Sequence, residues 1–341
     1  MSNNSIPRKK FFNRFRCFIF PAVFLLAALS APTQTPMPAL LVLEKSDDSL
    51  AIVDPATLKV VGRVPAGKDP HEVAASADGK LAYVSNYGGS QSVLKTISVI
   101  DLAARRALAP IDLGPLRGAH GIEFADGKVW FTAETNKVIA RYDPAAKQID
   151  WVMGTGQSRT HMLVFTKNLR KIFTSNVNSD TVSAIERTPD GKDWTVTAIP
   201  VGKGPEGIDL SPDGREVWAA NSGDGSVSVV EVSTKKVVQT LDAQTRHSNR
   251  LRFTPDGKLV LISDPAGGEL VVVEAASRKE RKRIHIGRNP QGIVVVPDSS
   301  RAYVALSRDN QVAVLDLKTL EVVGRIATGN SPDGMTWVPG K

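Results

Sequence analysis

The sequence is nearly free of cysteine and contains few histidines. One cysteine, Cys17, and five histidines occur among 341 residues. Because Cys17 lies in an N-terminal segment that we expect to be removed, the rest of the chain has no thiol. Disulfide bonds and thiolate metal sites are therefore excluded there, and any bound metal ion needs nitrogen and oxygen ligands.

No apolar run is long enough to span a bilayer. The longest, CFIFPAVFLLAALS, has about 14 residues, whereas a spanning helix needs roughly 20, and Pro21 interrupts it. Basic residues and no acid precede it, and the small residues Ala28 and Ser30 end it, as in a secretory signal. We predict a signal peptide over residues 1–30 and a short tether over 31–37. The protein is then periplasmic or secreted and has no membrane span after cleavage; an uncleaved anchor is the alternative.

The charge of the remaining chain is low. The full sequence carries a net charge of +8, and five of its basic residues belong to the predicted signal, which leaves about +3. This net charge is too small to indicate a nucleic-acid-binding surface. We expect a monomer whose partner is a protein or a small molecule.

The sequence lacks amphipathic helices of useful length and instead repeats itself. Seven similar segments recur at intervals of 41 to 49 residues, the period of a four-stranded propeller blade. They are DPHEVA (69–74), GAHGIE (118–123), RTHMLV (159–164), GPEGID (204–209), HSNRLR (247–252), NPQGIV (289–294) and SPDGMT (331–336).

Each unit has the composition of four short strands. A turn such as SPDG follows the first strand, and strands such as REVWAAN, SVSVVEV and KVVQTL come next. The chain ends with one strand of a unit and begins, near residue 38, with three strands that lack a first. We therefore predict an all-β fold over residues 38–341, a seven-bladed β-propeller of four-stranded blades whose ring is closed by a blade shared between the two ends.

The motifs YVSN, SPDG, VIDL and VLDL resemble those of the YVTN-repeat propellers, a secreted bacterial family that includes YncE-like proteins. The resemblance covers residues 38–341 and implies the propeller fold. The shared residues belong to turns and strands, so they specify the fold well and the function poorly. The second unit departs from the pattern and looks more like lyase-type or gluconolactonase-type propellers.

Polar residues recur at the third position of the seven segments, where the innermost strands begin. We expect them to ring one mouth of the central channel: His71, His120, His161, Glu206, Asn249, Gln291 and Asp333. The ends of the second strands are expected at the same mouth and add further polar residues: Glu44, Asn86, Glu134, Asn176, Asn221 and Asp264.

Three histidines at one structural position on successive blades favour a metal site. Neighbouring inner strands are close enough for three imidazoles to converge on one ion, with Glu206 as a fourth ligand or as a base. Imidazole and carboxylate suit zinc, copper, iron or nickel, and the sequence does not select among them. The alternative is that these histidines are polar residues facing a wet channel.

Two functions are consistent with this pattern. The first is an exported binding or scaffold module, which the resemblance implies. The alternative is a metal-dependent lactonase-like or lyase-like enzyme that uses the same polar ring. A metal carrier or sensor is the third possibility. No phosphate-binding glycine loop and no nucleophile elbow occur in the sequence.

Overall fold

A computed structural model describes residues 1–5, 7, 35, 37–88 and 92–340. The predicted signal peptide and most of the predicted tether lie outside these residues. Among the residues that the structure does describe, no helix is both long enough and apolar enough to cross a membrane.

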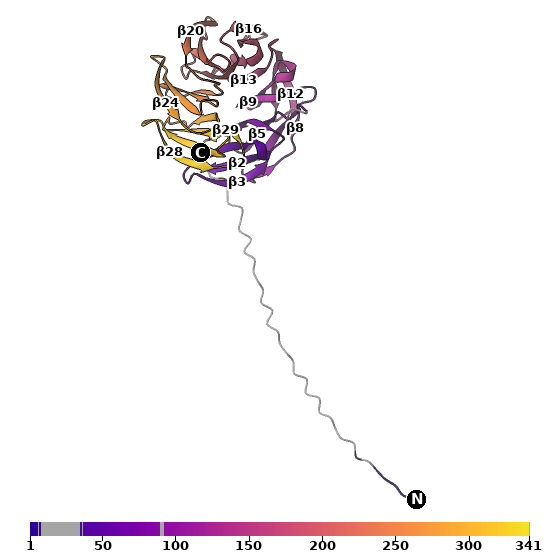
Figure 1. Ribbon diagram of the computed structural model, residues 1–341. Coiled ribbons are helices and arrows are strands. Elements are labelled where there is room, and N and C mark those ends of the chain that lie inside the picture. The colour runs from indigo at the N-terminus through magenta and orange to yellow at the C-terminus, as the bar shows by residue number, and fades with distance from the viewer. Residues whose placement is uncertain (6, 8–34, 36, 89–91, 341) are drawn as a thin grey trace. The chain divides into compact units, whose positions relative to one another are not determined.

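Seven antiparallel sheets stand around a central axis, as Figure 1 shows. The innermost strands are β4 (Pro70–Ala75), β9 (Ala119–Ala125), β13 (Thr160–Phe165), β17 (Pro205–Leu210), β21 (Leu251–Phe253), β25 (Pro290–Val295) and β29 (Pro332–Val338). The second strands are β5 (Leu81–Asn86), β10 (Lys128–Ala133), β14 (Lys171–Asn176), β18 (Glu216–Asn221), β22 (Leu259–Asp264), β26 (Arg301–Leu306) and β1 (Ala39–Glu44).

The outer halves of the blades follow the same order. The third strands are β6 (Thr96–Asp101), β11 (Val138–Asp143), β15 (Thr181–Arg187), β19 (Ser226–Glu231), β23 (Glu269–Glu274), β27 (Gln311–Asp316) and β2 (Ser49–Asp54). The outermost strands are β7 (Arg106–Ala107) with β8 (Ile111–Asp112), β12 (Gln148–Gly154), β16 (Trp194–Pro200), β20 (Lys236–Asp242), β24 (Lys279–His285), β28 (Glu321–Ala327) and β3 (Lys59–Pro65). Three short 3-10 turns follow second strands: η1 (Lys45–Asp47), η2 (Glu134–Asn136) and η3 (Val177–Ser179).

The ring closes as predicted. Strand β29 pairs with β1, with Leu40 opposite Trp337, so one sheet combines the last strand of the chain with its first three. The predicted seven-bladed propeller of four-stranded blades is confirmed. Pairing of the two ends removes the open sheet edges that the ring would otherwise expose.

The core lies between neighbouring blades. The second and third strands are almost entirely buried, with Trp218, Phe131 and Phe173 among the largest side chains fully removed from solvent. The outermost strands alternate between exposed and partly buried residues, as in β12. Each apolar cluster joins residues of adjacent blades. The innermost strands are therefore held in place by packing between neighbouring blades.

Glycines let the innermost strands approach each other closely. An added Cβ at Gly334 would come within 2.1 Å of the His71 carbonyl oxygen, and one at Gly121 within 2.6 Å of the His161 carbonyl oxygen. Only glycine fits such contacts with the next blade's backbone. The residue before each of these glycines is therefore held near its neighbour on the next blade.

Candidate active site

All seven residues predicted for the inner ring line one cavity of about 780 Å³ at the start of the innermost strands. His120 and His161 are buried, whereas His71 is partly exposed. Further cationic and acidic side chains from the loops complete its wall, among them Lys45, Arg159 and Asp69. The cavity is therefore strongly polar, with charges of both signs.

His161, one residue of this ring, forms a short hydrogen bond with Glu134. The Nδ1 atom of His161, on β13, lies 2.5 Å from Oε1 of Glu134, the first residue of η2. Tyr87 donates a hydrogen bond of 2.7 Å to the other carboxylate oxygen. Burial acts to raise the pKa of Glu134, but the hydrogen bonds from His161 and Tyr87 outweigh it and hold the pKa below its usual value. Glu134 is thus an anion that fixes the His161 ring with Nδ1–H as the donor.

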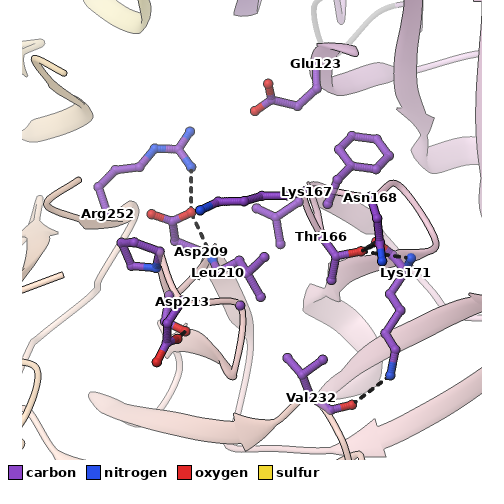
Figure 2. A pocket seen from close by; sticks show the side chains of 15 residues that line it. Glu123, Thr166, Lys167, Asn168, Lys171, Asp209, Leu210, Asp213, Val232 and Arg252 are labelled. Carbon is purple, nitrogen blue, oxygen red and sulfur yellow. Dashed lines mark hydrogen bonds and ion pairs between the residues drawn. The ribbon is translucent and has the colours of Figure 1, made fainter. Parts of the chain in front are cut away.

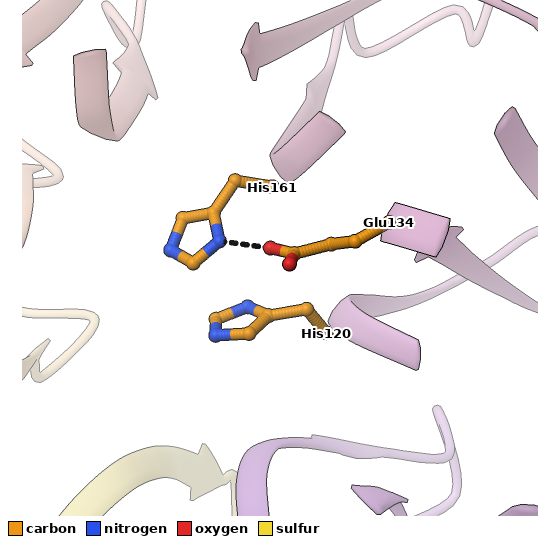
Figure 3. A group of neighbouring side chains, drawn as sticks. All are labelled: His120, Glu134 and His161. Atoms are coloured by element: carbon orange, nitrogen blue, oxygen red, sulfur yellow. Dashed lines mark hydrogen bonds and ion pairs between the residues drawn. The ribbon is translucent and has the colours of Figure 1, made fainter. Parts of the chain in front are cut away.

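The His120 ring lies against the His161 ring at a tilt of 34° and shares its surroundings. The two ring centroids are 3.8 Å apart, and Figure 3 shows both imidazoles beside Glu134. Burial, together with the neighbouring His161 and His71, holds the pKa of His120 well below its usual value, so the ring is neutral. Nδ1 of His120 and Nε2 of His161 are buried and have no hydrogen-bond partner among the described residues.

These three side chains can hold a metal ion. One ligand atom from each of His120, Glu134 and His161 lies within 4.8 Å of the others. Neutral imidazoles with a carboxylate suit first-row transition metals such as zinc, copper, iron or nickel. Two buried nitrogens without partners fit such an ion, because buried polar atoms are otherwise almost always satisfied.

His71 has a different environment from the two histidines that follow it. Its Nε2 atom lies 2.8 Å from the Lys45 ammonium, and its Nδ1 atom lies 2.9 Å from the carbonyl oxygen of Asp69. Both ring nitrogens are therefore engaged, Nε2 as acceptor and Nδ1 as donor. The structure brings the His71 ring within 4.8 Å of the His120 ring, yet its nitrogens serve Lys45 and Asp69 instead of a shared ion.

Glu206 lies at the edge of the cluster. Its Oε1 atom is 3.5 Å from Nε2 of His161 and 3.6 Å from the Arg159 guanidinium. Asn249 accepts a hydrogen bond from Arg250, and Asp333 lies 3.5 Å from Lys45. The predicted ligand set of His71, His120, His161 and Glu206 thus shares two histidines with the cluster, in which Glu134 is the nearest carboxylate.

Most residues at the ends of the second strands were expected at the channel mouth but point into their own blades. Those of five blades bond within their own blade or the adjoining loop, and none lines the cavity: Glu44, Asn86, Asn176, Asn221 and Asp264. Asn221, for example, donates to Ser226 and Ser228 of β19 at 2.8 and 3.0 Å.

Glu134 belongs to a different position of the repeat. Ala133 pairs with Ala119 as Asn176 pairs with Thr160, so Glu134 comes one residue later than the strand-end asparagines. Side chains alternate along a strand, so this shift turns Glu134 toward the channel. Lys45 and Tyr87 occupy the same position in their blades and reach the ring too; the sequence prediction missed both, although each directly follows a polar strand end.

A buried ion pair lies beneath the ring. Arg250 donates a hydrogen bond to Glu72, and both side chains are at most 9% exposed. Glu72 lies on β4 and Arg250 directly precedes β21, so the pair joins blades that are not neighbours. It crosses the channel under the cavity.

Comparisons with known proteins agree with this architecture. A curated protein, Antigen Lp49 of Leptospira interrogans, is 23% identical over 189 residues, 49% of this chain and 41% of that protein. The chain thus spans about two fifths of that relative. Among solved structures, the periplasmic gluconolactonase PpgL of Pseudomonas aeruginosa superposes with a TM-score of 0.71 at 16% identity and covers 90% of this chain and 100% of its own.

A second structure shows how broadly the fold is used. Hydrazine synthase of Kuenenia stuttgartiensis superposes with a TM-score of 0.64 at 17% identity and covers 78% of this chain and 88% of its own. At such identities the likeness shows the fold alone. The sequence itself carries a more specific signal, because residues 132–336, more than half of the chain, match the family described as lactonase, 7-bladed beta-propeller. The chain therefore belongs to the lactonase family of seven-bladed β-propellers.

Proposed function

We propose that this propeller is an enzyme that hydrolyses a lactone in the cavity at the channel mouth. The observation that carries the proposal is the buried His161–Glu134 pair beside the neutral imidazole of His120, both histidines lining the cavity. Membership of the lactonase family and the gluconolactonase among its structural relatives support the same reaction.

The ring of His161 has the chemistry of a general base. Glu134 accepts the Nδ1–H hydrogen bond, so Nε2 presents a lone pair to the cavity. Nε2 takes a proton from water as the water oxygen attacks the lactone carbonyl, and Glu134 stabilises the imidazolium that forms. The ring C–O bond then breaks, and the imidazolium returns its proton to the leaving alkoxide, which yields a hydroxy acid.

Arg159 supplies positive charge at the same place. Its guanidinium lies 3.8 Å from Glu134 and 3.6 Å from Glu206, on the cavity wall. A cation there stabilises the oxyanion that develops as the carbonyl carbon becomes tetrahedral.

We include a divalent transition metal as the alternative to the His161 base, because Nε2, the one free nitrogen of that ring, cannot hold an ion and accept a proton from water in the same reaction. His120 and His161, with Glu134 as third ligand or as hydrogen-bond partner of His161, would hold it; His71 and Glu206 of the predicted set stand next to it. Bound there, a metal ion would polarise the lactone carbonyl and lower the pKa of a bound water. Zinc, copper, iron and nickel all suit this donor set.

The binding or scaffold role of a YVTN-type propeller is the second candidate. Lys45 and Asp69 engage both nitrogens of His71, which favours this second role for that part of the cavity. With both nitrogens bonded to protein, His71 serves as a polar wall residue and not as a ligand of an ion. We further propose export to the periplasm or beyond, in keeping with the predicted signal peptide and the periplasmic gluconolactonase relative.

The test is hydrolysis of a lactone panel by protein purified without a metal-binding tag. The panel contains γ- and δ-lactones and sugar lactones, and the acid released is titrated at constant pH before and after chelation. We expect hydrolysis by the parent protein and a loss of about 10²–10⁴-fold in kcat/KM for His161→Ala. His285→Ala is the matched control, because His285 is exposed on β24. Absence of hydrolysis of every lactone, with and without added zinc, nickel, copper or iron, would favour the binding module.

A further inference from the structure

A second cavity lies at the opposite ends of the innermost strands. It has a volume of about 630 Å³ and is bounded by the turns after β13 and β17, whereas the candidate active site lies where these strands begin. Its size is that of a typical small-molecule site. Nothing in the proposed reaction uses this cavity.

Charged residues converge on it from three blades. Glu123 of β9, Asp209 of β17 and Arg252 of β21 hold the sixth position of their repeat segments, three residues beyond the ring of the active site. Figure 2 shows Glu123 on one side of the cavity and Asp209 with Arg252 on the other. The nearest separation of Arg252 from Asp209 is 3.8 Å, and Asp209 also accepts the backbone N–H of Phe253 at 2.8 Å.

Glu123 differs from Asp209 because its carboxylate has no hydrogen bond or ion pair with any residue that the structure describes. The side chain is partly exposed at the cavity, and burial of its carboxyl group raises the pKa of Glu123 to about 7; Arg252 opposes this shift, and Asp209 and Glu72 act in the same direction as burial. Burial disfavours the charged form of a carboxyl group, and a cation close to it favours that form. Arg252 is paired with Asp209. The negative charge of Glu123 at the inner end of the cavity therefore has no cationic partner of its own.

Apolar residues form part of the wall of this cavity, beside polar residues of the turns. Val164, Phe165 and Leu210 line the cavity between the two blades. A ligand that fits carries one positive charge and a short hydrocarbon part. Lys167 also lines the cavity, and Figure 2 shows its side chain extending toward Asp209; it is exposed, so solvent screens its charge.

We propose that this cavity binds a small organic ammonium ion, with Glu123 as the charged partner of the ammonium group and the apolar wall of Phe165 and Leu210 against its hydrocarbon part. The site is separate from lactone hydrolysis. Its ligand is held by a charge-assisted hydrogen bond from the ammonium group to the Glu123 carboxylate.

The experiment is calorimetric titration of the full chain with pentylammonium chloride, with 1-pentanol and sodium pentanoate as uncharged and anionic comparators. We expect saturable binding of pentylammonium, weaker or no binding of the comparators, and at least about tenfold weaker binding to Glu123→Gln. Asp126→Asn removes the same charge from an exposed position of the adjoining turn and should bind like the parent.

The outcomes separate this site from the proposed reaction. Pentylammonium that fails to bind the parent, or binds Glu123→Gln as tightly as the parent at an unchanged melting temperature, overturns the proposal. Binding that weakens equally in Asp126→Asn shows nonspecific attraction by net charge and overturns it too. Lactone hydrolysis by Glu123→Gln should stay at the parental rate, so a failure of either proposal can be recognised without the other.

Discussion

Two neighbouring positions at the end of each second strand have opposite roles in this propeller. The last strand residue, represented by Asn86, Asn176 and Asn221, bonds to hydroxyl groups of the next strand in its own blade. The following residue reaches the channel mouth in several blades, as Tyr87 and Glu134 do. A shift of one residue thus separates side chains that hold a blade together from side chains that build the site.

The difference follows from the alternation of side chains along a strand. A strand-end asparagine points into its blade, where its amide N–H groups donate to serine and threonine hydroxyls. The next residue lies in a short turn such as η2 and faces the axis. Chemical identity alone therefore says little about which polar residue of a repeat is functional.

The largest expected effect is on activity, at Glu134. In Glu134→Gln the His161 ring loses its anionic acceptor, so it is no longer held as an Nδ1–H tautomer and its imidazolium is less stable. We expect kcat/KM for lactone hydrolysis to fall about 10³-fold, by analogy with other oriented histidine bases, while the melting temperature changes little. Steady-state kinetics with thermal unfolding measures both, and unchanged kinetics in a folded variant would contradict the role assigned to Glu134.

Next in size is the ion pair under the ring. Arg250→Met leaves the buried Glu72 carboxylate without its partner, and we expect a loss of about 3 kcal/mol in the free energy of unfolding. Denaturant unfolding gives the value. The double variant Glu72→Gln/Arg250→Met should lose less than the sum of the two single variants, because neither charge is then stranded. Additive losses would show that the pair is not coupled across the channel.

Asn221→Ala should show the reverse of Glu134→Gln. Removal of the buried amide takes one hydrogen-bond donor each from Ser226 and Ser228 and leaves a cavity at a site where Asn221 and Ser228 are fully buried, and we expect about 2 kcal/mol less stability. The activity of the molecules that stay folded should match the parent. A variant as stable as the parent but with impaired lactone hydrolysis would place Asn221 in the site and erase the distinction between the two positions.

The effect that is smallest per residue and per pH unit is the dependence of stability on pH. The pKa of His120 is lowered by burial and by its histidine neighbours, and that of His71 by burial and by Lys45, both from a usual value of 6.5. As pH falls below 6.5, the unfolded chain takes up protons that these folded residues refuse. Stability should therefore decrease, by at most about 1.4 kcal/mol per pH unit for each histidine.

His120→Asn provides the control for this pH dependence. Denaturant unfolding of the parent and the variant between pH 7.5 and 5 compares their slopes, and the variant should have the shallower one because it lacks one of the two groups. Identical slopes would show that His120 is protonated equally in the folded and unfolded chain.

Much of the architecture could be predicted from local patterns. Turn motifs such as SPDG, strands such as REVWAAN and the seven spaced segments sufficed for the blade count and the shared closing blade, because turn chemistry and β-periodicity are local properties. The prediction that seven polar residues ring one mouth agrees with the cavity lining, since one repeat position recurs at one height of the channel. The register error at Glu134 arose because VWFTAETN has alanine where five other blades have a polar strand end.

By itself, the sequence determined the all-β repeat, its seven units and the small set of histidines and acids available for chemistry, because spacing and residue type are written in the chain. Only the tertiary structure decided which of them meet. It paired His161 with Glu134 and His71 with Lys45, and it joined Glu72 to Arg250 across 178 positions of the chain. Contacts between blades depend on side-chain direction and on the closure of the ring, and these arise only when all seven sheets pack together.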